Sequence, residues 1–235
     1  MTNSEHKNIL IVGASSGIGH ALARRLSSEN TSLFTISRRT PEGIQSTHLS
    51  ADITDAQADI ASFLPDVLHG VVYCPGSINL KPFQRLSADD FLRDFRINTL
   101  GAVQVLQAAL PALKKSGNAG VVLFSTVAVH SGMSFHASIS AAKGAVEGLT
   151  RSLAAEFAPF RIRVNAIAPS LTETPLAASL LSSPEKHEAA AKRHPLGRVG
   201  TADEIAAMAA FLLSEQAGWI TGQVIGVDGG KSVIS

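Results

Sequence analysis

A glycine-rich turn between an expected strand and an expected helix constrains the fold of this chain most strongly. The apolar run Asn8–Val12 leads directly into Gly13–Gly19, which has the sequence GASSGIG. Beyond the turn, Ala21, Leu22 and Leu26 recur at the spacing of one helix face. The segment therefore predicts a strand, a tight turn and a helix in succession.

The glycine spacing within this turn indicates a chemical role. Gly13, Gly17 and Gly19 follow a G-x3-G-x-G pattern. Glycine permits sharp turning and close approach of a ligand to the backbone, and the N-terminus of the following helix offers free N–H groups to a pyrophosphate. The pattern favours a dinucleotide site; the alternative is a turn that only packs a strand on a helix.

The next expected strand, Ser32–Ser37, ends in a serine and two arginines, Ser37, Arg38 and Arg39. In a dinucleotide fold this end meets the adenosine ribose, where a carboxylate would bind a free 2′-hydroxyl and repel a 2′-phosphate. Serine and guanidinium groups suit the phosphate, because arginine makes charge-assisted, bidentate contacts to such oxygens. We therefore predict NADP(H) rather than NAD(H); the alternative is that both arginines are solvated loop charges.

Strand and helix patterns alternate along the rest of the chain without a break in composition. This alternation predicts an α/β fold, a doubly wound Rossmann domain over residues 1–235, with a parallel sheet covered by helices on both faces. The further expected strands are Thr47–Thr54, Gly70–Cys74, Gly120–Phe124, Arg161–Ile167 and Gly222–Val227.

The expected helices lie between these strands. One follows Thr54 within residues 55–64, and one spans Asp89–Lys115 with a break near Asn98. Another begins at about Ser140, and a last one spans Ala202–Leu213. The long segment Leu171–Gly200 is expected to be mobile.

Composition narrows the class of protein. The chain has 45% hydrophobic residues and a net charge of +1, so it can bury a large core and lacks the basic surface of a nucleic-acid binder. Its single cysteine excludes an internal disulfide framework and a cysteine-based zinc site. The sequence has no apolar run of membrane-spanning length and no signal-peptide pattern, which predicts a cytoplasmic protein without a membrane partner.

Several segments together resemble the classical short-chain dehydrogenase/reductases. The resemblance implies a seven-stranded Rossmann sheet, a small-molecule substrate and a homo-oligomer, a dimer or more usually a homotetramer. The segments that carry it are Gly13–Gly19, Ala51–Ile53, Ile97–Gly101, Ala141–Lys143, Arg163–Pro169, Pro195–Ala206 and Ile220–Gly230.

The turn, the arginines and the resemblance together assign a set of residues to an NADP(H) cofactor. This set departs from the family's motifs at two places. Cys74-Pro75-Gly76 replaces the family's Asn-Ala-Gly, and Ser170 follows Pro169 where the family has a glycine. The residues assigned to the cofactor are Gly13, Ser15, Ser16, Gly17, Ile18, Gly19, Ser37, Arg38, Arg39, Asp52, Ile53, Cys74, Pro75, Gly76, Asn98, Lys143, Pro169, Ser170, Leu171, Thr172 and Thr174.

The family's catalytic motif is only partly present. Asn98 matches the asparagine that holds a water in the proton relay, and Lys143 matches the lysine that binds the nicotinamide ribose. The tyrosine four residues before that lysine is Ile139 here, and the serine thirteen residues earlier is Thr126. Threonine can donate a hydrogen bond to a carbonyl, whereas isoleucine cannot transfer a proton. The chain's tyrosine, Tyr73, is expected to pack in the fourth strand.

Three explanations of the missing phenol stay open. His136, Ser138 or Ser140 could supply the proton, and His136 has the most suitable chemistry, although a solvated loop histidine is the alternative. Ser140 lies about 100° around the helix from position 139 and is expected to face elsewhere. Alternatively, the substrate needs little proton help, as when an enone accepts hydride or a water held by Asn98 and Lys143 protonates the product. Lastly, the chain binds NADP(H) without catalysis.

We predict from these observations an NADP(H)-dependent oxidoreductase with atypical proton transfer. Its substrate would be a small carbonyl, alcohol or enone compound. The alternative is a catalytically impaired NADP(H)-binding protein with a regulatory role. The resemblance also implies that Leu176–His194 forms a mobile lid over the substrate pocket.

Overall fold

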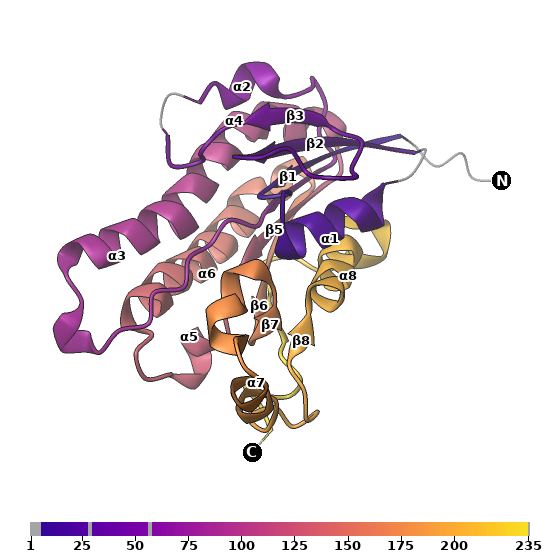
Figure 1. Cartoon of the computed structure of the whole chain (residues 1–235). Helices are drawn as coiled ribbons and strands as arrows, with labels where there is room; N and C mark the ends of the chain where they lie inside the picture. Colours follow the sequence, from indigo (N-terminus) through magenta and orange to yellow (C-terminus); the bar gives the residue numbers. More distant parts are fainter. Residues whose placement is uncertain (1–5, 28–29, 56–57, 235) are drawn as a thin grey trace.

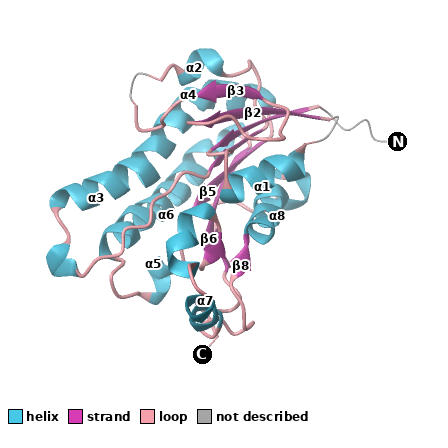
Figure 2. Ribbon diagram, in the orientation of Figure 1, coloured by secondary structure: helices cyan, strands magenta, loops and turns pink. Residues whose placement is uncertain are grey.

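A computed structural model describes residues 6–27, 30–55 and 58–234 of the chain. A central sheet is sandwiched between two layers of helices, as Figures 1 and 2 show. The sheet holds seven strands, all parallel, in the order β3-β2-β1-β4-β5-β6-β9. This arrangement confirms the doubly wound sheet predicted from the alternating pattern.

The strands agree closely with the expected positions. Their bounds are β1 (Lys7–Val12), β2 (Thr31–Ser37), β3 (Thr47–Ser50), β4 (Gly70–Tyr73), β5 (Ala119–Phe124), β6 (Ile162–Pro169) and β9 (Val224–Val227). The chain order reverses beside β1, between β2 on one side and β4 on the other. At such a switch point the loops after neighbouring strands diverge and leave a crevice at the carboxyl edge.

The helices cover both faces because successive strand residues point to opposite sides of the sheet. In β1, Leu10 and Val12 pack with one buried cluster, and Ile9 and Ile11 pack with the other. The first cluster includes residues of α2 (Ile60–Phe63), α4 (Gly101–Ser116) and α6 (Ala137–Phe157). The second includes residues of α1 (Gly17–Leu26) and α8 (Ala202–Leu213), the latter with the bounds that the sequence predicted.

The expected break in the long helix is present and is π-helical. The helix α3 (Ala88–Phe95) continues through a π turn, η2 (Arg96–Leu100), into α4. The buried Tyr73 hydroxyl donates a hydrogen bond of 2.6 Å to the carbonyl of Ile97 in this turn. Gly101 gives the hydroxyl room, since a Cβ there would overlap it. Tyr73 therefore packs as expected and also anchors the turn that carries Asn98.

Local bounds differ from the sequence expectations at some places. The third strand ends at Ser50 instead of Thr54, and α6 begins at Ala137 instead of Ser140. The expected helix within residues 55–64 is reduced to α2, and its residues 56 and 57 lie outside the described part of the chain. The described residues contain no helix that is long and apolar enough to cross a membrane.

The segment from 171 to 200 is more ordered than its sequence pattern indicated. Its ends pair as two short parallel strands, β7 (Thr172–Glu173) and β8 (Gly200–Thr201). Between them lie the 3-10 helix η4 (Pro175–Leu181) and α7 (Pro184–Ala191). The other short helices are η1 (Phe83–Arg85), α5 (Ala128–Ser131), η3 (Ala158–Phe160) and η5 (Glu215–Ala217).

Replacing Gly101 with alanine tests the packing at the π turn. Alanine would normally favour a helix, but its methyl group would overlap the rigid, buried Tyr73 hydroxyl. We expect Gly101→Ala to lower the free energy of unfolding by about 2 to 3 kcal/mol in urea titrations. Gly148→Ala in α6 is the matched control, because its added Cβ meets no atom within 4 Å. Equal stability of the two variants would contradict the packing role.

Candidate cofactor cleft and active site

A cleft of about 480 Å³ lies at the carboxyl edge of the sheet, at the switch point beside β1. It is formed by the glycine turn, the ends of β2 and β4, the loop after β3, and the start of η4. The residues that line it are Val12, Gly13, Ser15, Ser16, Gly17, Ile18, Gly19, Ile36, Ser37, Arg38, Arg39, Ala51, Asp52, Ile53, Thr54, Cys74, Pro75, Gly76, Ile97, Thr174, Pro175 and Leu176.

The glycine turn has a geometry that other residues could not adopt easily. Gly13 has φ of +83°, and its N–H donates to the carbonyl of Ile36 at 2.8 Å. A Cβ at Gly19 would overlap the Gly13 carbonyl, so α1 packs directly on the turn. The N-cap of α1, Ser16, makes no side-chain capping bond. The first N–H groups of α1 therefore remain available to an anion in the cleft.

At the far end of the cleft, exposed positive groups follow β2. Ser37 donates from its hydroxyl to the Arg39 carbonyl at 2.8 Å. Neither Arg38 nor Arg39 forms an ion pair with another described residue. Asp52 lies in the same wall, where hydrogen bonds from Thr54, assisted by Arg38, hold the pKa of its carboxyl below the usual value. The arginines can therefore meet a negatively charged group.

The unusual Cys74-Pro75-Gly76 segment packs tightly against the turn. The Cys74 N–H donates to the Val12 carbonyl at 3.0 Å, and Pro75 Cδ lies 3.2 Å from an ideal Cβ position on Gly13. Burial raises the pKa of the Cys74 thiol to about 12, so this group is neutral. The proline thus occupies space beside the turn without an N–H donor.

The buried side chains of Asn98 and Lys143 lie next to Gly76. An ideal Cβ on Gly76 would stand 3.2 Å from Asn98 Oδ1 and 3.6 Å from Lys143 Nζ, so the missing side chain lets both groups approach the cleft wall. Lys143 donates to the Phe124 carbonyl at 2.7 Å and is only 8% exposed. Burial lowers the pKa of its ammonium to about 8, although Cys74 and Asp94 oppose this shift.

Asn98 is held in one orientation by two hydrogen bonds. Its Nδ2 donates to the Asp94 carbonyl at 2.7 Å and to the Ser77 hydroxyl at 2.9 Å. Its Oδ1 is buried and has no partner among the described residues. Such an oxygen can accept a hydrogen bond from a water or a ligand.

The residues at the positions of the family's tyrosine and serine, Ile139 and Thr126, do not line the large cleft. Ile139 lies one helical turn before Lys143 in α6 and is 5% exposed. Thr126 accepts a hydrogen bond from the Ala128 N–H at 3.3 Å, which leaves its hydroxyl proton free to be donated. The site therefore keeps a possible donor at Thr126 and lacks an ionisable group at position 139.

The alternative proton donors have other partners. His136 begins α6 and donates from Nδ1 to the Ser134 carbonyl at 2.8 Å. Ser138 is buried beside Asn79, which lies 3.5 Å away. Ser140 points to the Ala128 carbonyl at 3.4 Å. Within the described ranges, none of these three forms a hydrogen bond or ion pair with Lys143 or Asn98.

Ser170, an unusual residue in the sequence, opens on a second, smaller cavity of about 150 Å³. Its hydroxyl lies 2.8 Å from Nε2 of the buried His194, whose Nδ1 donates to the Ala190 carbonyl. Leu171 lines the same cavity. Of the predicted cofactor residues after β6, Thr174 alone lines the large cleft, and it also caps η4 through the Ala177 N–H.

Sequence patterns missed part of the site. The sequence assigns no cofactor role to the lining residues Val12, Ile36, Ala51, Thr54, Ile97 and Pro175, and it assigns Leu176 only to the lid, although each adjoins or lies near an assigned position. Asp94 and Ser77, which orient Asn98, also had no assigned role. Asp94 is four residues before Asn98, a helical spacing that places both on one face, and this was the available signal.

The parallel sheet, the glycine turn and the cleft at the switch point define a nucleotide-binding Rossmann fold. The sequence matches the family described as Enoyl-(Acyl carrier protein) reductase over residues 13–232. The chain belongs to the short-chain dehydrogenase/reductase family of oxidoreductases, which act on small molecules with an NAD(P)(H) cofactor.

Individual relatives are similar along almost the whole chain. A tropinone reductase homolog of Arabidopsis thaliana is 36% identical, over 96% of this chain and 93% of its own length. The ligand-free aldohexose dehydrogenase of Thermoplasma acidophilum has a TM-score of 0.90 at 28% identity, over 98% of this chain and 96% of that one. A protein of Agrobacterium tumefaciens described as a 2-deoxy-D-gluconate 3-dehydrogenase, with bound NADP, has a TM-score of 0.88 at 30% identity, over 97% of each chain.

The buried Lys143 predicts a measurable cost in stability. Because its pKa in the folded chain lies below the usual 10.5, the unfolded chain binds more protons between about pH 8 and 10.5. The free energy of unfolding should therefore rise with pH over this range. We expect Lys143→Met to remove this rise and to stabilise the chain at pH 7 by about 1 to 2 kcal/mol, in urea titrations at several pH values. A destabilised variant at pH 7 would show that the lysine serves folding.

Proposed function

We propose that this protein is an NADP(H)-dependent oxidoreductase that acts on a small carbonyl, alcohol or enone compound. One observation carries the proposal: a costly buried ammonium, Lys143, is kept together with an oriented amide, Asn98, behind the Gly76 wall of the cleft. A chain selected only for stability would not keep an unneeded cation in this position. The homo-oligomer implied by the family and the cytoplasmic location expected from the sequence are carried over as part of the proposal.

The residues of the cleft fit the proposed cofactor. The glycines provide a cradle that side chains would fill, and the uncapped start of α1 suits a pyrophosphate. Lys143 and Asn98 would lie at the nicotinamide ribose, and Thr174 would close the cleft from the η4 side. When bound, the cofactor supplies or accepts the hydride, while the chain orients the substrate and handles the proton.

The choice of NADP(H) over NAD(H) is supported by Arg38 and Arg39, which are exposed at the cleft and form no ion pair with another described residue. The Agrobacterium relative with bound NADP is consistent with this choice. The nearby Asp52 is engaged by Thr54, so its carboxylate is already satisfied by the turn.

Replacing Arg38 with alanine tests the cofactor preference. We expect the Kd of NADPH, followed by fluorescence titration, to rise about tenfold to a hundredfold, because a charge-assisted contact to the phosphate is lost. The Kd of NADH should change little. Arg85→Ala is the control, since this exposed arginine lies in η1, outside the cleft lining. An equal loss for both cofactors would contradict recognition of the 2′-phosphate.

The substitution Ile139→Tyr tests whether the remaining site is ready for the family's usual chemistry. A phenol one turn before Lys143 would supply general acid catalysis, which is worth about 10² to 10⁴ in rate. We therefore expect at least about a hundredfold rise in kcat/KM for ketone reduction with NADPH. Ile139→Phe is the matched control, because it adds the ring without the hydroxyl. If both variants show the same rate, the phenol is not what the site lacks.

A catalytically impaired NADP(H)-binding protein is the second candidate function. It is favoured by the apolar, buried Ile139 at the position of the proton donor. Screening ketones, quinones and enones for NADPH oxidation separates the two functions, because a binder would show cofactor affinity without turnover. Absence of binding to NADPH and NADP+ at millimolar concentration would rule out both.

A further inference from the structure

The most unusual polar group near the site is the carboxylate of Asp94. It lies in α3 and has no exposed surface. One oxygen accepts a hydrogen bond of 2.7 Å from the Ser77 hydroxyl, and the other, Oδ2, has no partner among the described residues. A buried carboxylate is costly unless a nearby positive charge or several hydrogen bonds compensate it.

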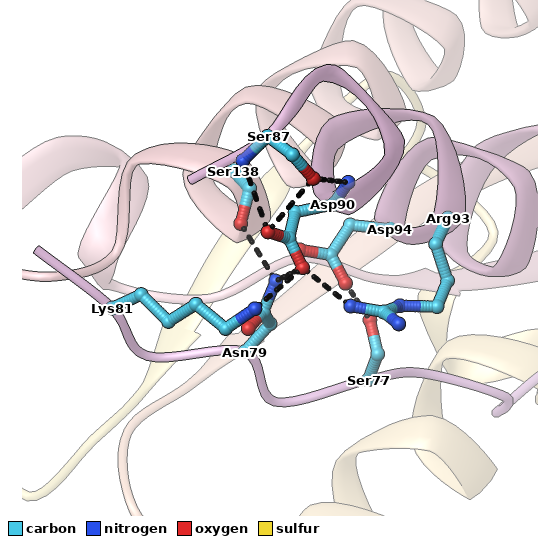
Figure 3. A network of polar contacts seen from close by, with 8 residues as sticks. All are labelled: Ser77, Asn79, Lys81, Ser87, Asp90, Arg93, Asp94 and Ser138. Carbon is cyan, nitrogen blue, oxygen red and sulfur yellow. Dashed lines mark hydrogen bonds and ion pairs between the residues drawn. The ribbon is translucent and has the colours of Figure 1, made fainter. Parts of the chain in front are cut away.

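Two positive groups near Asp94, Lys81 and Arg93, are engaged by another carboxylate. Asp90, one turn earlier in α3, accepts hydrogen bonds from Lys81 at 2.8 Å and from Arg93 at 2.5 Å. Figure 3 shows both cations directed at Asp90, with Asp94 and Ser77 on the neighbouring side of the network. The hydrogen bond from Lys81 is the largest of the causes that hold the pKa of Asp90 well below its usual range. Asp94 is therefore left without either cation.

A continuous polar connection runs from Asp94 toward Lys143. The Ser77 hydroxyl donates to Asp94 and accepts from Asn98 Nδ2 at 2.9 Å. Because Nδ2 is used in this way, Oδ1 of the amide turns to the opposite side, beside Gly76 and Lys143 Nζ. The Asp94 backbone carbonyl and, through Ser77, the Asp94 carboxylate together select the amide orientation that presents Oδ1 to the Gly76 side of the site.

We propose that Lys143 itself delivers the proton in place of the missing phenol, and that Asp94 is its buried counter-charge, which acts through Ser77 and Asn98. This inference rests on the proposed oxidoreductase function and assigns the group that completes its reaction. Lys143 is a catalytic residue in this proposal, and Asp94 is a positioning residue.

The proposed proton step is balanced. As the carbonyl carbon accepts hydride, the electron pair of the C=O π bond moves to oxygen. The oxygen takes a proton from the Lys143 ammonium, directly or through a water held by Asn98 Oδ1, and the carbonyl becomes an alcohol. Lys143 is left as a neutral amine, with the Asp94 carboxylate behind Ser77 and Asn98, and a proton from solvent restores the ammonium. Alcohol oxidation follows the same step in reverse.

The charged groups around Lys143 are few. Cys74 from the end of β4 and Asp94 from α3 act on its charge, and the thiol is neutral. Glu147, one turn later in α6, accepts from Ser125 at 2.7 Å and pairs with His130 at 3.0 Å and Arg151 at 3.6 Å. Asp89 and Arg96 are exposed, Asp90 is paired as described, and Arg163 in β6 donates to carbonyls of the α8 side. Asp94 is thus the acid that supports the Lys143 ammonium.

The first test follows the Lys143 ammonium in the cofactor-free protein by NMR of ¹³C,¹⁵N-labelled lysine side chains. Lys143→Met identifies the resonance, and its titration midpoint in the unchanged chain is expected at about pH 8. Asp94→Asn keeps the shape and the bond from Ser77 but removes the charge, so the midpoint should fall by about one pH unit or more. Asp90→Asn is the matched control and should leave the midpoint unchanged. An unchanged midpoint in Asp94→Asn overturns the proposal.

The second test uses the pH dependence of ketone reduction. With NADPH, kcat/KM should decline above the Lys143 midpoint, and Asp94→Asn should move this decline to lower pH by the shift seen in the NMR titration. Ser77→Ala, which keeps the charge and frees the amide, should lower kcat about tenfold or more with little change in KM. This variant also tests the proposal if Asp94→Asn does not fold. A decline in rate that does not follow the Lys143 midpoint overturns the catalytic role.

The two levels of the proposal fail in different ways. If neither cofactor binds in fluorescence titrations, the oxidoreductase function fails and the catalytic role of Lys143 fails with it, whatever the NMR titration shows. If NADPH binds and ketones are reduced but the NMR midpoint ignores Asp94, the oxidoreductase function stands and the counter-charge is wrong.

Discussion

The hydrogen bond from Lys143 to the Phe124 carbonyl ties α6 to the end of β5 and places a cation inside the protein. Burial of this ammonium disfavours its charged form, so the surrounding structure has to supply compensating groups. The Phe124 carbonyl is one such group, and Asp94 in α3 opposes the fall in the pKa of Lys143. Their arrangement depends on the parallel sheet, which brings the ends of β4 and β5 side by side.

The π turn between α3 and α4 has a comparable role on the other side of the site. Tyr73 holds the turn through the Ile97 carbonyl, and the turn buries Asn98 against Ser77. The chain's tyrosine thus supports the site from within the core, since burial raises its pKa further above neutrality and its hydroxyl is already donating. The π turn η2 therefore has two roles, because it packs in the core and also orients the Asn98 amide.

The cleft shows how a departure from a family pattern can be absorbed. Pro75 packs on Gly13 and removes an N–H, while the Cys74 backbone still donates to the neighbouring strand. The glycine turn and the two arginines are unaffected, so the ends of the cleft that would hold pyrophosphate and ribose phosphate remain. The main chemical difference from the family pattern is the buried Ile139, which lies one helical turn before Lys143.

The sequence by itself determined the α/β fold with a parallel sheet, the glycine turn, the break at Asn98 and the helix Ala202–Leu213. These features depend on local periodicity and on residues with special backbone preferences. The resemblance to the family, read on the sequence, also implies the role of Lys143 and places Ile139 where the family has a tyrosine. Only the tertiary structure decided that Ser170 opens on a separate cavity and that Asp94 is buried without a cation of its own. Burial and pairing depend on which elements meet across the fold, and the charge of an aspartate in an amphipathic helix does not reveal what packs over it.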